Sequence, residues 1–174
     1  YLIIPADSTA ELPAGIEKEM ILVHQPIESA YVSDDTALAT LDELGLLDAV
    51  KTVGVEPDTT TVEAVKSGLA DGSMTYAGAA DDLQYRELVK SKCDFAVLPA
   101  DILSSDETAD TDVKSKLSDA ADSFATLDVP MLVDRSADEE TELGKREWIK
   151  VYGALFGCTG QTDSLFQKAV DAAK

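Results

Sequence analysis

Short apolar runs that alternate with amphipathic helical segments are the feature that most restricts how this chain can fold. The runs cover residues 21–23, 50–55, 74–76, 95–98 and 131–133. Each run is too short for a helix and is typical of a strand buried on both faces of a sheet. Such strands need long crossover connections, which place them parallel to one another.

Four segments between these runs carry apolar residues at helical spacing. The first begins after Ser33 or Asp34, which are suitable N-cap residues, and the second ends near Gly72. The apolar positions are Leu38, Leu41 and Leu44; Val62, Val65 and Leu69; Tyr85, Leu88 and Val89; and Val113, Leu117, Ala120, Phe124 and Leu127. Alternating strands and helices predict an α/β fold: a three-layer sandwich with a mostly parallel, twisted sheet of about five strands.

The stretch LGKREWIKVYGALFG, residues 143–157, differs from the rest of the chain. Trp148, Tyr152 and Leu155 share one side of a predicted helix, and Ile149 and Phe156 extend the apolar surface toward a second side. A terminal helix that covers only its own sheet would keep a wider polar face. Two interpretations stay open: a central helix of the same core, or a long connector packed between two lobes.

Charge excludes two classes of partner. Asp and Glu number 34 against 14 Lys and Arg, which gives a net charge of -20. Because phosphate binding requires a basic surface, we expect no nucleic acid partner and no docking on an anionic membrane. The acidic surface is expected to be solvated, with a cation-binding surface as the alternative. The 174 residues suit one domain and include no apolar run long enough to span a bilayer.

The sequence lacks the common motifs of catalysis and metal binding. It has no GxSxG, P-loop, GxGxxG or CxxC motif, so we expect no enzymatic activity, no cofactor and no metal site. Cys93 and Cys158 are expected to be small buried residues or free thiols, and His24 a packed residue. The acidic segment 104–112, SSDETADTD, lacks the glycine and glutamate of a calcium loop and is expected to be solvated.

Four loops follow the carboxyl ends of the predicted strands, where open parallel sheets bind their ligands. They cover residues 26–35, 77–87, 99–106 and 134–144, and they should meet at one edge of the sheet. Their polar and aromatic candidates are Tyr31, Ser33, Asp82, Tyr85, Asp101 and Arg135. None of these residues forms a nucleophile–base set, so binding is favoured over catalysis.

Three blocks of the sequence resemble one known group of proteins. The blocks are LATLDELGLLDAVKTVGV (38–55), MTYAGAADDLQYRELVKSKCDFAVL (74–98) and, most specifically, VPMLVDRSADEETELGKREWIKVYGALFG (129–157). They resemble the first lobe, and the start of the helix that follows it, in the cluster-A (class III) substrate-binding proteins of ABC importers. That group includes the ferric-siderophore and cobalamin binders.

The resemblance implies two α/β lobes joined by one long helix, with the ligand held in the cleft between them. Residues 1–142 then correspond to the N-terminal lobe and residues 143–174 to the connecting helix, and the second lobe is a missing partner. The implied function is the extracytoplasmic component of an ABC importer, lipid-anchored in the full-length protein. It would capture a ferric siderophore or a related metal chelate and deliver it to a permease in the membrane.

The resemblance also implies roles for single residues. The expected ligand contacts are Tyr31 and Ser33 in the first loop, Asp82 and Tyr85 in the second, Asp101 in the third and Arg135 in the fourth. Glu87 is similar to a glutamate that docks on basic pockets of the permease. Arg135 suits a carboxylate or a chelated anionic complex. The fourth loop departs from the family pattern because acids replace the usual serine, tyrosine and histidine.

Two other functions stay open. A stand-alone α/β protein-interaction module would use its exposed terminal helix to recruit a partner or to self-associate. An α/β enzyme would need a pair of titratable residues close together in a cleft.

Overall fold

The computed structural model describes residues 1–103 and 112–174, with side chains for all of these except Glu17 and residues 112–118. Most of the acidic segment 104–112 therefore lies outside the described residues. The chain forms two compact units, one of residues 28–138 and one of residues 1–27 together with 139–174. The division into a lobe of residues 1–142 and a helix region of residues 143–174 stays a prediction.

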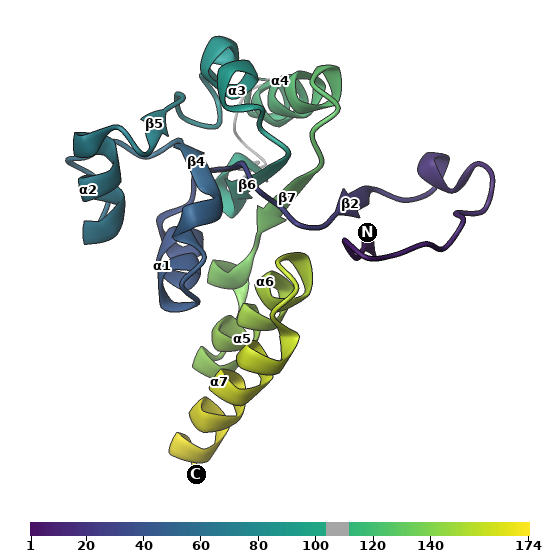
Figure 1. The fold of residues 1–174 in the computed structure, drawn as a ribbon. Coiled ribbons are helices and arrows are strands. Elements are labelled where there is room, and N and C mark those ends of the chain that lie inside the picture. The colour runs from purple at the N-terminus through teal and green to yellow at the C-terminus, as the bar shows by residue number, and fades with distance from the viewer. Residues whose placement is uncertain (104–111) are drawn as a thin grey trace. The chain divides into compact units, whose positions relative to one another are not determined.

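The unit 28–138 is built on a five-stranded sheet in which every strand pair is parallel (Figure 1). The strands are β3 (Ala30–Val32), β4 (Val50–Val53), β5 (Thr75–Tyr76), β6 (Phe95–Pro99) and β7 (Met131–Asp134). Their order in the sheet is β5-β4-β3-β6-β7. The predicted α/β fold with a mostly parallel sheet of about five strands is confirmed.

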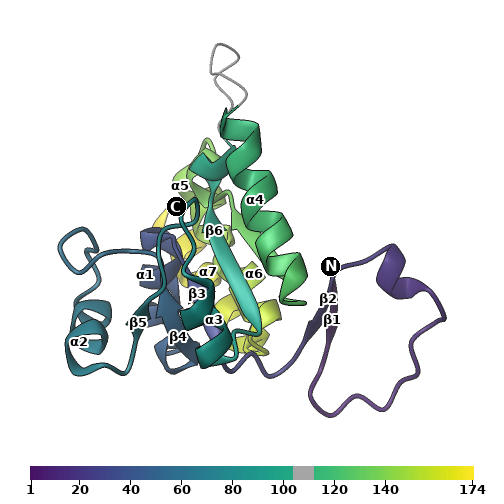
Figure 2. The ribbon, with the colours of Figure 1, turned by 90° about the horizontal axis from the view of Figure 1, so that it is seen from above.

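Helices connect these strands and cover both faces of the sheet. They are α1 (Asp35–Glu43), α2 (Glu63–Asp71), α3 (Tyr85–Ser91) and α4 (Asp112–Thr126), with the short 3-10 helices η2 (Leu47–Ala49), η3 (Ala100–Leu103) and η4 (Ser136–Asp138). In Figure 1, α3 and α4 lie on one side of the sheet and α1 on the other, and Figure 2 shows α4 beside β6. Both faces are covered, as a parallel sheet requires.

The helix ends follow the predicted capping residues. Asp34 is the N-cap of α1, where its Oδ1 accepts a hydrogen bond of 2.7 Å from the backbone N–H of Ala37. Gly72 is the C-cap of α2 with a φ of 81°, a conformation that side chains with a Cβ rarely adopt. Both assignments are confirmed.

One large core cluster lies between the sheet and helices α3 and α4. Tyr31, Leu88 and Phe124 are among its fully buried members, and the rings of Tyr31 and Phe124 have centroids 5.7 Å apart in a tilted arrangement. Burying side chains of this size contributes about 1.5–3 kcal/mol each to folding. In α4 the expected residues Ala120 and Phe124 face the sheet. In α3 only Leu88 does so, and the expected stripe is wrong for Tyr85 and Val89, which are 42% and 59% exposed.

The centre of the sheet differs from the prediction. Residues 21–23 were expected to provide its first strand, but this run falls in and just before β2 (Leu22–His24), which pairs with β1 (Leu2–Ile4) in a separate two-stranded sheet. The central strand is β3, in a segment predicted as a loop. The three apolar residues 30–32 lie between two serines, and a run this short does not show the periodicity of a strand. Pairing with β4 on one side and β6 on the other sets the position of β3 instead.

The helical end of the other unit consists of three helices: α5 (Glu142–Glu147), α6 (Ile149–Leu155) and α7 (Thr159–Ala172). The single long helix expected from residue 143 is thus divided. Gly157, with a φ of 74°, lies in the turn between α6 and α7 and lets the chain reverse there. The same unit contains η1 (Ile16–Lys18). His24, at the end of β2, is exposed, so the expectation of a packed histidine is wrong.

Helices α6 and α7 pack closely where Gly153 faces Thr162. A Cβ on Gly153 would overlap the Thr162 hydroxyl and lie 2.7 Å from its Cγ2 and 2.9 Å from its Cβ. Both residues are buried. Lys150 of α6 lies 4.0 Å from the centroid of the Phe166 ring of α7 and adds a cation–π contact. The absence of a side chain at residue 153 permits this approach.

Replacing Gly153 by alanine is expected to destabilise this helix pair, because a Cβ cannot be accommodated beside the Thr162 Cβ. We expect a loss of about 1–3 kcal/mol in the free energy of unfolding, the usual cost of overpacking. Urea denaturation followed by far-UV circular dichroism measures this change. Gly160→Ala is the matched control, since a Cβ at Gly160 meets nothing within 4 Å. Equal stabilities for the two variants would contradict the packing described here.

Candidate functional site

The carboxyl ends of the five parallel strands meet at one edge of the unit 28–138. The sheet grows from β3 in two directions, toward β4 and β5 on one side and toward β6 and β7 on the other. The switch point therefore lies between β3 and β6, where open α/β sheets form their ligand crevice. Ser33 joins the two strand ends, since its N–H and its Oγ lie 3.0 Å and 3.3 Å from the carbonyl oxygen of Val97.

Three carboxylates gather at this switch point. Burial raises the pKa of Asp34 above its ordinary value, and the negative charges of Asp134 and Asp101 raise it further, against the hydrogen bond from Ala37. Asp134 is buried, and its Oδ1 accepts a hydrogen bond of 2.7 Å from the Ser136 N–H. The sequence did not mark Asp34 or Asp134 as site residues, because only the pairing of β3, β6 and β7 brings them near Asp101.

Tyr31 occupies a different place from the one expected. It lies in β3 with 0% of its surface exposed, and its hydroxyl donates a hydrogen bond of 2.8 Å to the carbonyl oxygen of Gly78. Burial raises the pKa of this phenol. The expected position in a loop is wrong, because the residue belongs to the central strand. Tyr31 has no exposed surface to offer a ligand, and its hydroxyl holds the loop 77–84 against the sheet.

Two glycines make this junction between strand ends possible. A Cβ on Gly54 would overlap the Tyr31 hydroxyl and the Ser33 Cβ, and it would lie 3.0 Å from the carbonyl oxygen of Gly78. Gly78 has a φ of 81°, and a Cβ there would overlap the backbone of Asp82. The backbone of the loop 77–84 therefore lies so close to the ends of β3 and β4 that no side chain fits at residue 54. Its path fixes where Asp82 lies and where α3 begins.

The remaining expected ligand contacts lie along this edge. Ser33 is half-buried, Asp82 is exposed in the loop 77–84, and Tyr85 is the first residue of α3 with 42% of its surface exposed. Asp101 is exposed in η3, and Arg135 is exposed after β7. The Nε of Arg135 lies 2.8 Å from Asp138 Oδ2 in an exposed ion pair. Their roles in binding a ligand stay predictions.

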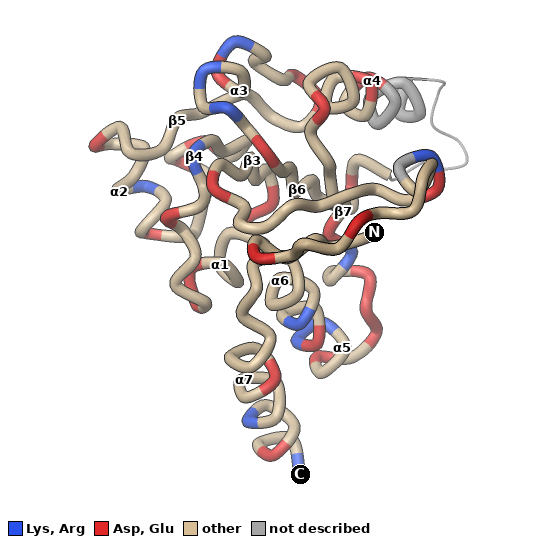
Figure 3. The backbone as a smooth tube through the Cα atoms, turned by 45° about the vertical axis from the view of Figure 1, so that its right-hand side comes forward, with Lys and Arg blue, Asp and Glu red and all other residues tan. Residues whose placement is uncertain are grey.

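Glu87 lies in the first turn of α3 and is less exposed than expected. Its side chain is 22% exposed and forms an ion pair of 3.2 Å with Lys90. Basic residues cluster around α3 (Figure 3), where Arg86, Lys90 and Lys92 are all exposed. Docking of Glu87 on a permease stays a prediction.

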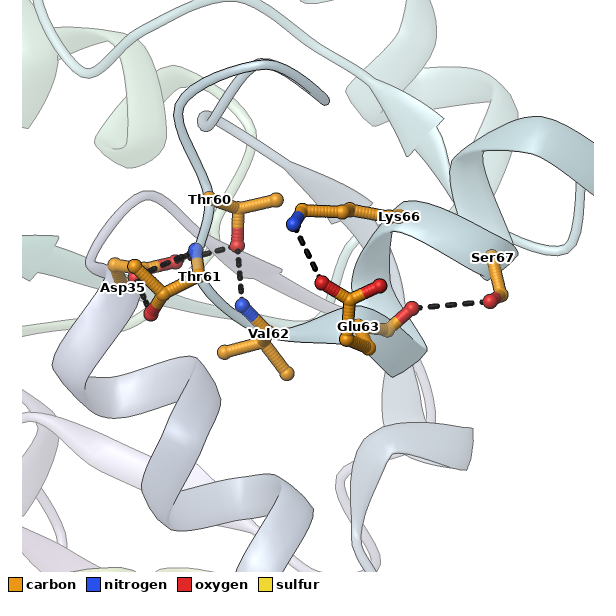
Figure 4. A network of polar contacts seen from close by, with 7 residues as sticks. All are labelled: Asp35, Thr60, Thr61, Val62, Glu63, Lys66 and Ser67. Carbon is orange, nitrogen blue, oxygen red and sulfur yellow. Dashed lines mark hydrogen bonds and ion pairs between the residues drawn. The ribbon is translucent and has the colours of Figure 1, made fainter.

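A second polar network fixes the loop between β4 and α2 (Figure 4). The Asp35 carboxylate accepts hydrogen bonds from the hydroxyls of Thr60 and Thr61, both 2.5 Å, and from the backbone N–H of Thr61 at 3.0 Å. Thr60 is 3% exposed, and its Oγ1 accepts from the Val62 N–H at 3.2 Å. The start of α1 thereby holds the loop 54–62 and the first turn of α2.

The two cysteines, Cys93 and Cys158, lie in different units of the chain. Cys93 and Cys158 are free and half-buried, which confirms their expected character. Burial raises the pKa of Cys93 to about 12, so this thiol stays protonated at neutral pH. Among the described residues, no group of three or more His, Cys, Asp or Glu residues is arranged to hold a metal ion. Of the described helices, none has the length and apolar character that crossing a membrane requires.

Several solved structures share the fold of this chain. The petrobactin-binding protein YclQ of Bacillus subtilis matches with a TM-score of 0.54 and 17% identity over 79% of this chain and 41% of its own. The catecholate-siderophore binding protein VctP of Vibrio cholerae matches with a TM-score of 0.56 and 14% identity over 84% of this chain and 45% of its own. The expected resemblance is confirmed at the level of the fold.

A haem-binding protein shares the same fold. The periplasmic protein HutB of Vibrio cholerae matches with a TM-score of 0.55 and 14% identity over 83% of this chain and 48% of its own. In each of the three comparisons the chain spans less than half of the matched protein, and the matched part is the N-terminal one. No family model and no curated protein matches the sequence.

Removal of the Tyr31 hydroxyl is expected to loosen the loop 77–84. In Tyr31→Phe the buried carbonyl of Gly78 loses its donor, which costs about 1–3 kcal/mol of stability. Hydrogen–deuterium exchange should show that the substitution speeds exchange, relative to the wild type, more in residues 77–84 than in β3. Tyr85→Phe, which removes an exposed hydroxyl, is the control. Unchanged exchange in Tyr31→Phe would show that the loop is held by other contacts.

The Asp35 network predicts a definite pH dependence. Burial raises the pKa of Asp35, but the hydrogen bonds from Thr60 and Thr61 outweigh this effect and lower the pKa overall. The stabilisation is therefore present above the pKa of the unfolded state, about 3.9, and is lost as the pH falls through the lower folded-state value.

Asp35→Asn should cost about 1–2 kcal/mol at pH 7, and its deficit relative to the wild type should shrink below about pH 4. Thermal unfolding of both proteins across this pH range measures the difference. Asp42→Asn, an exposed substitution on the same helix, should show little deficit at any pH. A deficit of Asp35→Asn that stays constant with pH would contradict the charged hydrogen bonds.

Proposed function

We propose that this chain is the N-terminal lobe of the solute-binding component of an ABC importer, and that it binds a ferric siderophore or a related metal chelate. The observation that carries the proposal is the doubly wound parallel sheet, whose solved counterparts are the N-terminal parts of siderophore-, iron- and haem-binding proteins. The function is capture and delivery, in which no bond of the ligand is made or broken.

The strand-end edge supplies the lobe's half of a binding surface. Ser33, Asp82, Tyr85, Asp101 and Arg135 come from different loops and lie at the ends of parallel strands. Hydrogen bonds tie Ser33 and the loop 77–84 to the sheet, which favours a preformed surface over one that orders on binding. A second lobe would close over this edge and exclude water from the ligand.

The proposed partner on the membrane side is the permease of the importer. We propose Glu87 and the exposed face of α3 as the contact region, because charged groups on a rim steer docking between protein surfaces. The proposed location is extracytoplasmic, which is supported by matched proteins described as periplasmic. Lipid anchoring of the full-length protein is part of the same proposal.

A stand-alone interaction module is the second candidate. It is favoured by α7, on which Leu165, Phe166, Ala169 and Val170 are all only half-buried. Such a stripe could receive a second lobe of the same chain or a separate protein. The complete reading frame separates these candidates, since a second strand–helix series would support the binding protein.

Isothermal titration calorimetry with ferric chelates tests the proposed function. The product of the complete reading frame should bind at least one ferric siderophore with a Kd of about 1 µM or tighter, because both lobes then contribute contacts. The 174-residue chain alone should bind with a Kd of about 0.1 mM or weaker, since about half of the contacts are missing. Micromolar binding by the single lobe would contradict the two-lobe mechanism.

A further inference from the structure

The loops at the switch-point edge have a strong excess of acidic residues. Five described segments follow the strands of the unit 28–138: residues 33–34, 54–62, 77–84, 100–103 and 135–138. Their acidic residues are Asp34, Glu56, Asp58, Asp81, Asp82, Asp101 and Asp138. Arg135 is the only Lys or Arg in the five segments, and Asp138 lies 2.8 Å from it. An anionic ligand would therefore meet little positive charge here.

The negative charge is concentrated where the topology places the ligand. Asp34, from the end of β3, is within electrostatic reach of Asp101 after β6 and of Asp134 at the end of β7. These are the strand ends at and beside the switch point, so the position of the charge follows from the strand order. Like charges repel one another, and the repulsion is stronger in a cleft that excludes water than in bulk water.

Two cations follow these segments closely in the chain: Lys66 of α2, which forms an ion pair of 2.6 Å with Glu63, and Arg86, the second residue of α3. Next to Arg86, Tyr85 is 42% exposed. The two further bases of this region, Lys90 and Lys92, lie at the other end of α3, and Lys90 is paired with Glu87. An exposed aromatic ring on the helix that follows Asp81 and Asp82 suits a ligand with a cationic group, because aromatic rings attract cations. The carboxylates of this edge repel anions, and the exposed Tyr85 ring provides a surface that a cationic group can contact.

We propose that this edge selects a metal chelate without net negative charge, either neutral or cationic, and rejects polyanionic chelates. The proposal rests on the proposed function, because it takes the strand-end edge as the binding surface. Asp101 and Asp82 are the residues assigned to this selection. Both are exposed at the edge, and neither is the helix cap or the buried carboxylate of the group.

Calorimetry with three ferric chelates of similar size tests the selection on the product of the complete reading frame. The probes are a monocationic linear trihydroxamate, a neutral cyclic trihydroxamate and a trianionic tris-catecholate. The trianionic probe should bind at least about tenfold more weakly than the better of the other two, and this gap should narrow at high salt. Tightest binding of the trianionic probe would overturn the selection and leave the proposed function intact. Binding of none of the three would overturn both.

A charge-matched pair of double variants assigns the selection to residues. Asp82→Asn with Asp101→Asn should strengthen binding of the trianionic probe by about three- to tenfold and weaken binding of the monocationic probe. Asp42→Asn with Asp48→Asn removes the same charge from exposed positions in α1 and η2, before the amino end of β4, and should change neither affinity by more than about twofold. Equal effects of the two double variants would overturn the assignment. Thermal unfolding checks that all four substitutions leave the fold intact.

Discussion

The position of β3 at the centre of the sheet is the constraint on which the rest of the unit 28–138 depends. Parallel pairing with β4 and β6 buries all three residues of this strand, and it sends the chain outward in two directions from one point. The Asp94 carboxylate accepts hydrogen bonds of 2.8 Å and 3.0 Å from the N–H groups of Glu28 and Ser29, which anchors the chain just before the strand. The switch point, and with it the candidate site, follows from this arrangement.

Close backbone approach converts the strand order into a defined surface. Tyr31 extends from the buried strand to the carbonyl of Gly78, and Gly54 leaves the space for this contact. At the start of α1, Asp35 holds the loop 54–62 through Thr60 and Thr61. Because these interactions are buried or charge-assisted, they resist local opening more than exposed turns do. The loop 77–84, which carries the candidate ligand contact Asp82, is therefore held by the core.

The charge pattern of the strand-end edge adds to what the fold alone supports in the proposed function. The likeness to siderophore- and haem-binding proteins concerns the fold, and the loops of this chain have their own charge pattern. An excess of carboxylates at the switch point is an unfavourable setting for a polyanion and a tolerable one for a neutral or cationic chelate. The same fold can hold different ligands because the loops set the chemistry and the sheet sets only the geometry.

The sequence by itself determined the features that depend on local pattern. Alternation of apolar runs with amphipathic segments identified the α/β fold, and Asp34 and Gly72 marked helix ends because capping acts over a few residues. Only the tertiary structure decided that residues 30–32, and not the predicted run 21–23, provide the central strand of the five-stranded sheet. It also decided that Tyr31 is buried and that Asp34, Asp101 and Asp134 come together. Strand order and burial arise from contacts between residues far apart in the chain, and a local period does not contain that information.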